Sequence, residues 1–309
     1  ANPWLAEQED QARLDLAQLV AEGDRLAFST DSYVIDPLFF PGGNIGKLAI
    51  CGTANDVAVS GAIPRYLSCG FILEEGLPME TLKAVVTSMA ETARTAGIAI
   101  VTGDTKVVQR GAVDKLFINT AGMGAIPANI HWGAQTLTAG DVLLVSGTLG
   151  DHGATILNLR EQLGLDGELV SDCAVLTPLI QTLRDIPGVK ALRDATRGGV
   201  NAVVHEFAAA CGCGIELSEA ALPVKPAVRG VCELLGLDAL NFANEGKLVI
   251  AVERNAAEQV LAALHSHPLG KDAALIGEVV ERKGVRLAGL YGVKRTLDLP
   301  HAEPLPRIC

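Results

Sequence analysis

Aromatic residues and positive charge are both scarce in this chain of 309 residues. Phe, Trp and Tyr make up 4% of it, whereas 33 glycines and 49% hydrophobic residues indicate a globular protein packed by small and aliphatic side chains. Acidic residues outnumber basic ones by 36 to 25, which gives a formal charge of −11. Because nucleic-acid binding needs a basic surface, this composition argues against a nucleic-acid partner.

Long apolar runs and a leader pattern are missing too. No run approaches the roughly 20 apolar residues that span a bilayer. The N-terminus, Ala1-Asn2-Pro3-Trp4, has no basic region followed by an apolar stretch, and it begins without Met. The seven cysteines follow no framework spacing, so we expect reduced thiols in a cytoplasmic protein without a membrane partner. Cys211-Gly212-Cys213 offers two soft metal ligands, but no nearby residue completes a tetrahedral set.

Hydrophobic periodicity divides the chain into two halves that both mix strands with helices, which predicts an α/β protein of the α+β type. In residues 1–135 we expect strands at 25–31, 65–73, 98–102 and 116–125 and helices at 44–61 and from Pro78 onward. In residues 136–298 we expect strands at 142–146, 214–217, 247–252, 274–281 and 285–290 and helices at 152–163, 174–184, 200–210 and 256–265. The pattern leaves open whether the sheets are parallel or mixed.

Residues 299–309 form a third segment, a tail that ends in Cys309. Its three prolines exclude a regular helix and favour an extended polyproline II conformation. A thiol at the end of such a tail buries little, so we expect a flexible segment that presents Cys309 to a partner or to the chain's own cleft. An ordinary frayed terminus is the alternative.

Three short acidic segments of the first half are expected at strand ends or in loops: Thr30-Asp31-Ser32-Tyr33, Asn55-Asp56-Val57-Ala58 and Gly103-Asp104-Thr105-Lys106. Their carboxylates, Asp31, Asp56 and Asp104, are the hard oxygen ligands that hold Mg²⁺ against phosphate, and Lys106 would neutralise phosphate charge. A single aspartate of this kind is more typical of a turn or cap. The combination within one domain favours a metal and phosphate site.

Two segments of the second half also predict chemistry. Asp194-Ala195-Thr196-Arg197-Gly198-Gly199 precedes an expected helix, whose N-terminal N–H groups favour a phosphate; a capping turn with an exposed arginine is the alternative. Asn244-Glu245-Gly246 puts a carboxylate on a tight turn, with a plain surface-loop acid as the alternative. The six histidines do not cluster, and we interpret His152 and His205 as helix-surface or core residues.

Together these five segments resemble the aminoimidazole ribonucleotide synthetase superfamily of ATP-dependent enzymes over essentially the whole chain. The resemblance implies a PurM-like fold, in which an N-terminal domain that binds ATP and Mg²⁺ pairs across a homodimer into a barrel-like sheet. A C-terminal α/β domain follows, with the nucleotide bound in between. The superfamily's initial His-Gly-x-Gly-Gly segment is absent from this chain, so we expect an incomplete phosphate site.

The ending Pro306-Arg307-Ile308-Cys309 is similar to that of one family in the superfamily, a group of hydrogenase maturation factors. This implies an enzyme that dehydrates a carbamoyl group on Cys309 to a thiocyanate with ATP, for the iron of nickel–iron hydrogenase. Such a reaction needs a cation at the transferred phosphoryl and a base at the nitrogen, and Lys106 and Glu245 fit these roles. We expect the remaining residues of the segments at the nucleotide: Asn55, Thr105, Asp194, Thr196, Arg197, Gly198 and Gly199.

The resemblance also implies partners, namely the carbamoyltransferase HypF for loading and the HypC–HypD complex for delivery. Rival interpretations come from other classes. A selenophosphate synthetase or a thiamine-phosphate kinase would share the aspartate segments without needing a terminal cysteine. A non-catalytic carrier would deliver a thiol-bound group from the tail.

Overall fold

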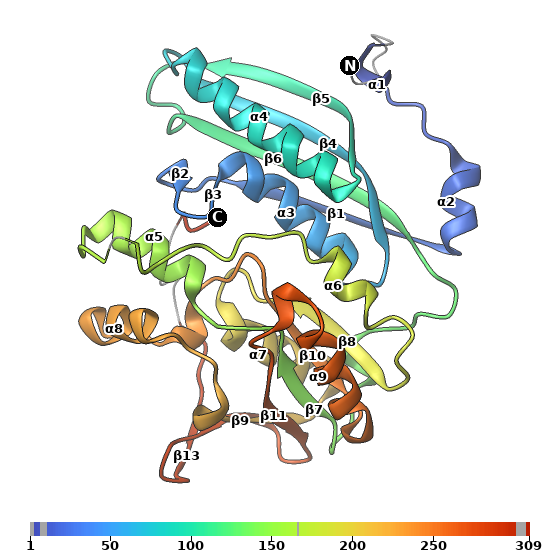
Figure 1. The fold of residues 1–309 in the computed structure, drawn as a ribbon, viewed down its shortest axis with the longest axis vertical. Coiled ribbons are helices and arrows are strands. Elements are labelled where there is room, and N and C mark those ends of the chain that lie inside the picture. The colour runs from blue at the N-terminus through green and yellow to red at the C-terminus, as the bar shows by residue number, and fades with distance from the viewer. Residues whose placement is uncertain (1–2, 7–10, 166, 301–306) are drawn as a thin grey trace. The chain divides into compact units, whose positions relative to one another are not determined.

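A computed structural model describes residues 3–6, 11–165, 167–300 and 307–309. The chain forms two compact units, one made of residues 1–130, 173–177 and 309, the other of residues 131–172 and 178–308. Each unit has its own sheet, as the ribbon in Figure 1 shows. Among the helices that the structure describes, none is long and apolar enough to cross a membrane.

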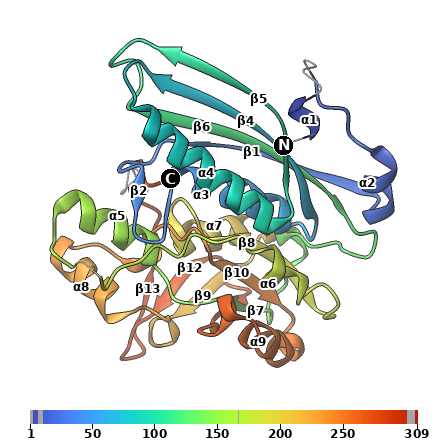
Figure 2. The same cartoon turned by 45° about the horizontal axis from the view of Figure 1, so that its top comes forward.

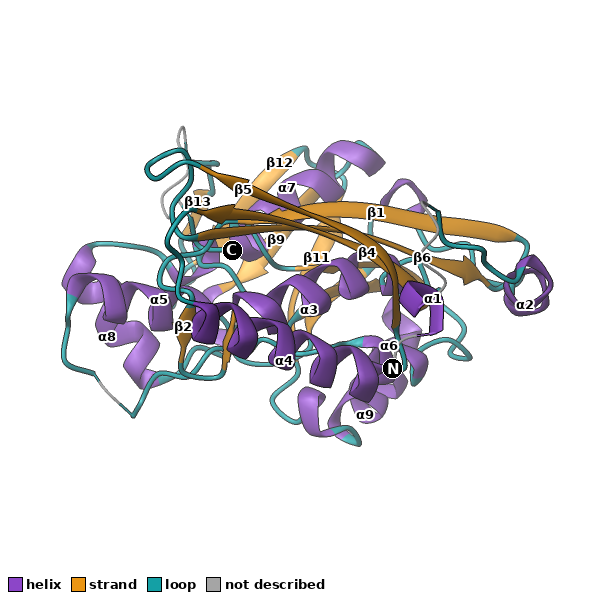
Figure 3. Ribbon diagram, turned by 90° about the horizontal axis from the view of Figure 1, so that it is seen from above, coloured by secondary structure: helices purple, strands orange, loops and turns teal. Residues whose placement is uncertain are grey.

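The first unit is built on a four-stranded sheet with the strand order β1-β6-β4-β5. Strands β4 and β5 are parallel, and the other neighbours are antiparallel. Helices α3 and α4 lie together on one face of the sheet (Figure 3). The elements are β1 (Arg25–Tyr33), β4 (Ile63–Glu74), β5 (Ala99–Val108), β6 (Leu116–Ile126), α3 (Ile45–Ala58) and α4 (Met79–Ala96), with a small β2–β3 hairpin (Phe39–Phe40, Gly43–Asn44).

Helix α3 is the core of this unit, since 12 of its 14 residues are buried. It begins at Asn44, whose side chain accepts hydrogen bonds from the backbone N–H groups of Gly46 and Lys47. Two short helices precede the sheet, α1 (Pro3–Ala6) and α2 (Leu16–Glu22). Leu19 of α2 packs against Tyr66 and Val101, which are strand residues of β4 and β5.

The second unit, whose ribbon Figure 2 shows, is built on a seven-stranded sheet. Its strand order is β13-β12-β9-β11-β7-β10-β8. All residues of β7 and β10 are buried although their side chains alternate between faces, so both faces of the central strands are covered. Helix α7 packs into one core cluster, and α9 contacts β7 and β11. The strands are β7 (Val142–Val145), β8 (Val189–Asp194), β9 (Gly214–Ser218), β10 (Leu248–Val252), β11 (Ala274–Val280), β12 (Gly284–Ala288) and β13 (Lys294–Thr296); the helices are α5 (Asp151–Glu161), α7 (Gly199–Cys211), α8 (Pro226–Leu235) and α9 (Ala257–His265).

The helix expected at residues 174–184 is wrong, because α6 spans only Thr177–Gln181. Asn55 gives the physical reason. Its Nδ2 donates to the carbonyl of Ala174 at 3.0 Å, and its Oδ1 accepts the N–H of Leu176 at 2.8 Å. These two bonds hold residues 174–176 in a non-helical segment, and Pro178, which is tolerated only in the first turn of a helix, sets the start of α6 beside it.

Asp31 and Asp104 do not lie at strand ends or in loops as expected, whereas Asp56 lies in a helix, in agreement with the helix expected at 44–61. Asp31 is inside β1, Asp56 is inside α3 and Asp104 is inside β5. Regular backbone therefore fixes the direction of each carboxylate, and loop conformation does not.

The expectation of an exposed end is wrong for residues 307–309, while the flexibility of the tail stays a prediction. Ile308 is 2% exposed, and Cys309 is half-buried. The backbone oxygen of Cys309 accepts a hydrogen bond from the N–H of Val34 at 3.0 Å. The rest of the expected polyproline stretch, residues 301–306, lies outside the described residues.

Candidate functional site

Asp31 and Asp56 face the same side of the first sheet. Ser29 and Asp31 are two residues apart on β1 and so share a face. Ser29 Oγ donates to Asp56 Oδ2 at 2.7 Å, which makes that face the one α3 covers. Asp31 has no ion-pair partner within the described ranges. Two carboxylates on one side of a sheet are a donor set that fits Mg²⁺.

Asp104 lies far from Asp31 in the same chain. In the sheet register Asp31 pairs with Thr120, Thr120 with Cys69 and Cys69 with Gly103, which makes three strand spacings, or about 14 Å. Asp104 follows Gly103 and therefore points to the opposite face. Because Mg–O distances are about 2.1 Å, Asp31 and Asp104 of one chain cannot bind one ion. No group of three or more His, Cys, Asp or Glu side chains is placed for a metal in the part of the chain that is described.

Asp104 pairs instead with Lys106 on the same face of β5. The Lys106 Nζ lies 2.8 Å from Asp104 Oδ2, with 70% and 67% of the two side chains exposed. Hydrogen bonds from Lys106 and from the N–H of Thr105 lower the pKa of Asp104, so this carboxyl stays ionised. An exposed pair of this kind adds little stability and exchanges partners readily, which leaves Lys106 able to turn to a phosphate.

In the second unit, Asn244 joins three loops from a fully buried position. Its Oδ1 accepts the N–H of Gly150 at 2.7 Å, and its Nδ2 donates to the carbonyls of Ala195 at 3.0 Å and Phe242 at 2.9 Å. The N–H of Asn244 also donates to Ala195. Asn244 thus holds the loop after β8 against the segment that carries Glu245.

Glu245 is 2% exposed, so the alternative of a plain surface acid is wrong. Its N–H donates to Asp172 Oδ1 at 3.0 Å, and Lys247 Nζ lies 3.4 Å from Asp172 Oδ2. The buried Asp172 carboxylate thus accepts from the Glu245 backbone and pairs with the Lys247 ammonium, which fixes the segment that carries the Glu245 side chain. Asp172 was missed from the sequence, because this residue belongs to no recognisable motif. The only hint near a motif was Lys247, the cation two residues after Glu245, which needs a buried acidic partner.

The loop after β8 leads from the buried Asp194 to the exposed Arg197 and then into α7. Gly198 and Gly199 have φ of 74° and 61°. A Cβ on Gly199 would lie 2.4 Å from the Leu240 carbonyl oxygen, so turn geometry and packing both require glycine there. Thr196 contributes its carbonyl to the Gly199 N–H. Phosphate binding at the start of α7 stays a prediction, as does nucleotide binding by Asn55 and Thr105.

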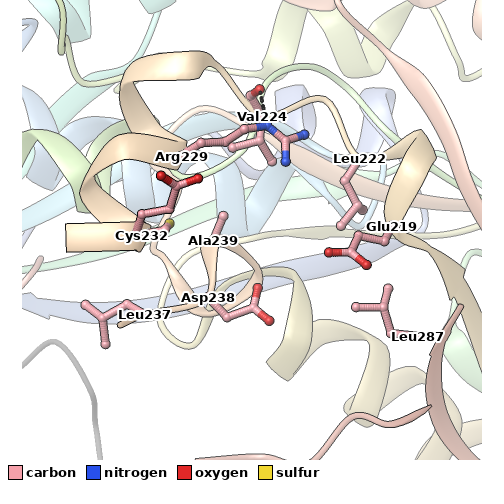
Figure 4. Close-up of a pocket in the computed structure, with 10 residues that line it drawn as sticks. Glu219, Leu222, Val224, Arg229, Cys232, Leu237, Asp238, Ala239 and Leu287 are labelled. Atoms are coloured by element: carbon pink, nitrogen blue, oxygen red, sulfur yellow. Dashed lines mark hydrogen bonds between the residues drawn. The ribbon is translucent and has the colours of Figure 1, made fainter. Parts of the chain in front are cut away.

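A cavity of about 240 Å³ lies elsewhere in the second unit, and no predicted site residue lines it (Figure 4). Cys232 is one of its lining residues. Burial and the nearby Asp238 raise the pKa of Cys232 to about 11. The thiol is therefore protonated at neutral pH and is a poor nucleophile.

Family comparisons agree with these two units. The model of the AIR synthase related protein N-terminal domain matches residues 8–126, and that of the C-terminal domain matches residues 138–289. The chain therefore belongs to the AIR synthase related family. The carbamoyl dehydratase HypE of Rhodobacter capsulatus is 50% identical over 97% of this chain and 89% of its own length. Within the family, the chain belongs to this HypE group.

Solved structures support the same grouping. A crystal structure of E. coli HypE is 98% identical with a TM-score of 0.98, covering 100% of this chain and 96% of that chain. A HypE in complex with ATP is 46% identical with a TM-score of 0.94, covering 100% and 92%. The HypE chain of a HypE–HypF complex is also 46% identical, with a TM-score of 0.87 and coverage of 97% and 96%. The predicted two-domain PurM-like fold is thereby confirmed.

Proposed function

We propose that this chain uses ATP to dehydrate a carbamoyl group on the sulfur of Cys309 to a thiocyanate, as a source of cyanide for the iron of nickel–iron hydrogenase. The observation that carries the proposal is the docked end of the chain, Ile308 and Cys309, in a member of the HypE group. A cysteine that is held in place by its backbone, with a half-buried side chain, suits a substrate attached to the protein itself.

In the overall reaction, thiocarbamate and ATP give thiocyanate, ADP and phosphate, so the water lost from the carbamoyl group is consumed in the cleavage of ATP. The thiocarbamate oxygen attacks the γ-phosphorus and ADP leaves; the C–O bond then breaks, phosphate departs and the nitrogen loses both protons. Lys106 would stabilise the transferring phosphoryl group, and Glu245, beside Asp172, would accept a proton from nitrogen. Mg²⁺, when bound by Asp31 and Asp56, supplies charge neutralisation at the phosphates.

We also propose a homodimer that forms through the edges of the first sheet. Strands β1 and β5 are the two edges, and both expose apolar side chains: Leu26 at 58%, Phe28 at 67% and Val107 at 66%. Unpaired edges of this kind favour pairing with another strand. A second copy is also the source from which Asp104 can join Asp31, since the register separates them within one chain.

The partners of the proposed reaction are a HypF-type carbamoyltransferase that loads Cys309 and a HypC–HypD complex that receives the product. The HypF partner is supported by the crystallised HypE–HypF complex. Cys309 must remain a thiol before loading, and Cys51 and Cys69 are buried cysteines outside any disulfide. The reducing cytoplasm suits both requirements.

The test is a mass measurement on the C-terminal peptide of the dimer. Cyanate carbamoylates thiols, so the chain can be loaded without its partner and then given Mg-ATP. Loss of one water from the loaded peptide, with matching ADP release, is the expected result, and Cys309→Ala should show neither. ATP turnover that continues unchanged in Cys309→Ala would overturn the proposal in favour of another ATP-dependent enzyme; loading without ATP turnover would favour a carrier.

Mixed dimers test the shared site. Asp31→Asn and Asp104→Asn should each lose activity, while their mixture should regain part of it, because one site of the mixed dimer keeps both carboxylates. A mixture as inactive as its parts would mean that each site draws on one chain only.

A further inference from the structure

His152 of α5 is fully buried, and both of its ring nitrogens are engaged. Nε2 lies 2.7 Å from the carbonyl oxygen of Ile308, and Nδ1 lies 2.7 Å from Ser171 Oγ. A carbonyl oxygen only accepts, so Nε2 carries the proton. Desolvation lowers the pKa of His152, and the ring is neutral; Nδ1 therefore accepts from the Ser171 hydroxyl. Ser171 thus selects the tautomer that bonds Ile308.

A second residue of α5 bonds the preceding carbonyl. The Arg160 guanidinium donates to the backbone oxygen of Arg307. Arg307 itself has a φ of 56°, which is uncommon for a residue with a Cβ, and the Ile308 side chain after it is buried. A frayed terminus would make none of these contacts. The two side-chain donors, the unusual turn and the buried isoleucine therefore indicate a specific binding site for the end of the chain.

We propose that His152 is a positioning residue that docks the C-terminal end of the chain, with Ser171 as the group that fixes its tautomer and Arg160 as a second donor. This inference rests on the proposed function only for its purpose, which is to hold the residue after Ile308 for reaction. The docking itself is a property of the free protein and is measurable without ATP or a loading partner.

The chain offers a matched set of variants. His152→Gln keeps a donor near the position of Nε2, whereas His152→Asn keeps a group near Nδ1 and loses the donor to Ile308. His205→Asn is the control, because His205 Nε2 also lies beside a backbone carbonyl, that of Leu297, at 2.8 Å, but not at the end of the chain. Ile308→Ala removes the buried side chain next to Cys309.

The measurement is the alkylation rate of Cys309 in the full chain by a maleimide. Cleavage after Lys294 releases residues 295–309, in which Cys309 is the one cysteine. In His152→Asn, the loss of one hydrogen bond should shift the equilibrium toward the undocked end of the chain. The alkylation rate of Cys309 should therefore rise about 2- to 12-fold. The rate in His152→Gln and His205→Asn should stay near that of the parent, and Ile308→Ala should exceed His152→Asn.

A rate in His152→Asn equal to that of the parent overturns the proposal. If that variant fails to fold, Ile308→Ala decides, and an unchanged rate there overturns it equally. In the loaded protein, His152→Asn should form thiocyanate more slowly at unchanged Mg-ATP affinity, with rescue in His152→Gln. If the loaded parent protein itself forms no thiocyanate, the proposed function is refuted. The alkylation rates still test whether His152 docks the end of the chain.

Discussion

Replacing Asn244 by Ala should destabilise the second unit and loosen the segment that presents Glu245. The change removes three side-chain hydrogen bonds, from Gly150 and to Ala195 and Phe242, at a site with no solvent exposure. At about 0.5–1.5 kcal/mol each, their loss should lower the free energy of unfolding by about 1.5–4.5 kcal/mol. Three backbone groups in the core would lose their hydrogen bond to the Asn244 side chain. Because buried polar groups without a partner are costly, we expect a loss of unfolding free energy in the upper part of that range.

Native-state hydrogen exchange is the assay, because it resolves each unit separately. The Gly150 amide should exchange faster in Asn244→Ala by a factor that matches the loss of stability, together with the amides of the loop after β8. Asn119→Ala is the control, since Asn119 also makes side-chain hydrogen bonds but is exposed on β6. If the free energy of exchange of the Gly150 amide in Asn244→Ala stays within about 0.5 kcal/mol of its value in the parent protein, the role assigned to Asn244 is refuted.

Three further predictions follow from the site. Asp56→Asn should weaken Mg-ATP binding about 10- to 150-fold, from a loss of about 1.5–3 kcal/mol, while the dimer persists; unchanged binding by calorimetry would make Asp56 structural. Glu245→Gln should bind ATP and keep a carbamoylated Cys309 yet dehydrate it about 10²- to 10⁴-fold more slowly in single turnover, and normal dehydration would return Glu245 to a structural role. Burial lowers the pKa of His152 below its usual 6.5, so the unfolded chain takes up this proton first as the pH falls. The contribution of neutral His152 to the free energy of unfolding should be complete above about pH 6.5. Below that pH it should decline toward the folded pKa, by at most about 1.4 kcal/mol per pH unit. Denaturant titrations at several pH values should show a flatter slope in His152→Gln.

The fold could be predicted where one side of an element is buried. The start of α4 expected at Pro78 is correct, and the apolar three- and four-residue steps predict the burial of Met89 and Ala93, but Met79 and Val86 of that series are exposed and Val85 is buried instead. Helix α8 was missed although its signals were local, with Pro226 at the first turn and Gly236 in a left-handed C-cap. The false helix over 174–184 is a different kind of error, because the competing bonds come from Asn55, more than 100 residues away.

Candidate site residues can be picked out of the sequence, but their arrangement in space cannot. The motifs gave the acidic residues, but strand order decides that Asp31 and Asp104 lie on opposite edges of one sheet. Strand order depends on long-range pairing, which no local pattern encodes. Asp172 was invisible for a related reason, since it approaches Glu245 and Lys247 only through tertiary structure.

Three hydrogen bonds at the end of the chain are made to its backbone. His152 bonds the carbonyl of Ile308, Arg160 bonds that of Arg307, and the N–H of Val34 bonds the backbone oxygen of Cys309. None of these three bonds uses the Cys309 sulfur. Conversion of the thiol to a thiocarbamate or a thiocyanate therefore leaves each of them intact. These three bonds do not distinguish substrate from product, so under the proposed function that discrimination falls to the groups proposed for the chemistry, Lys106 at the phosphoryl group and Glu245 at the nitrogen.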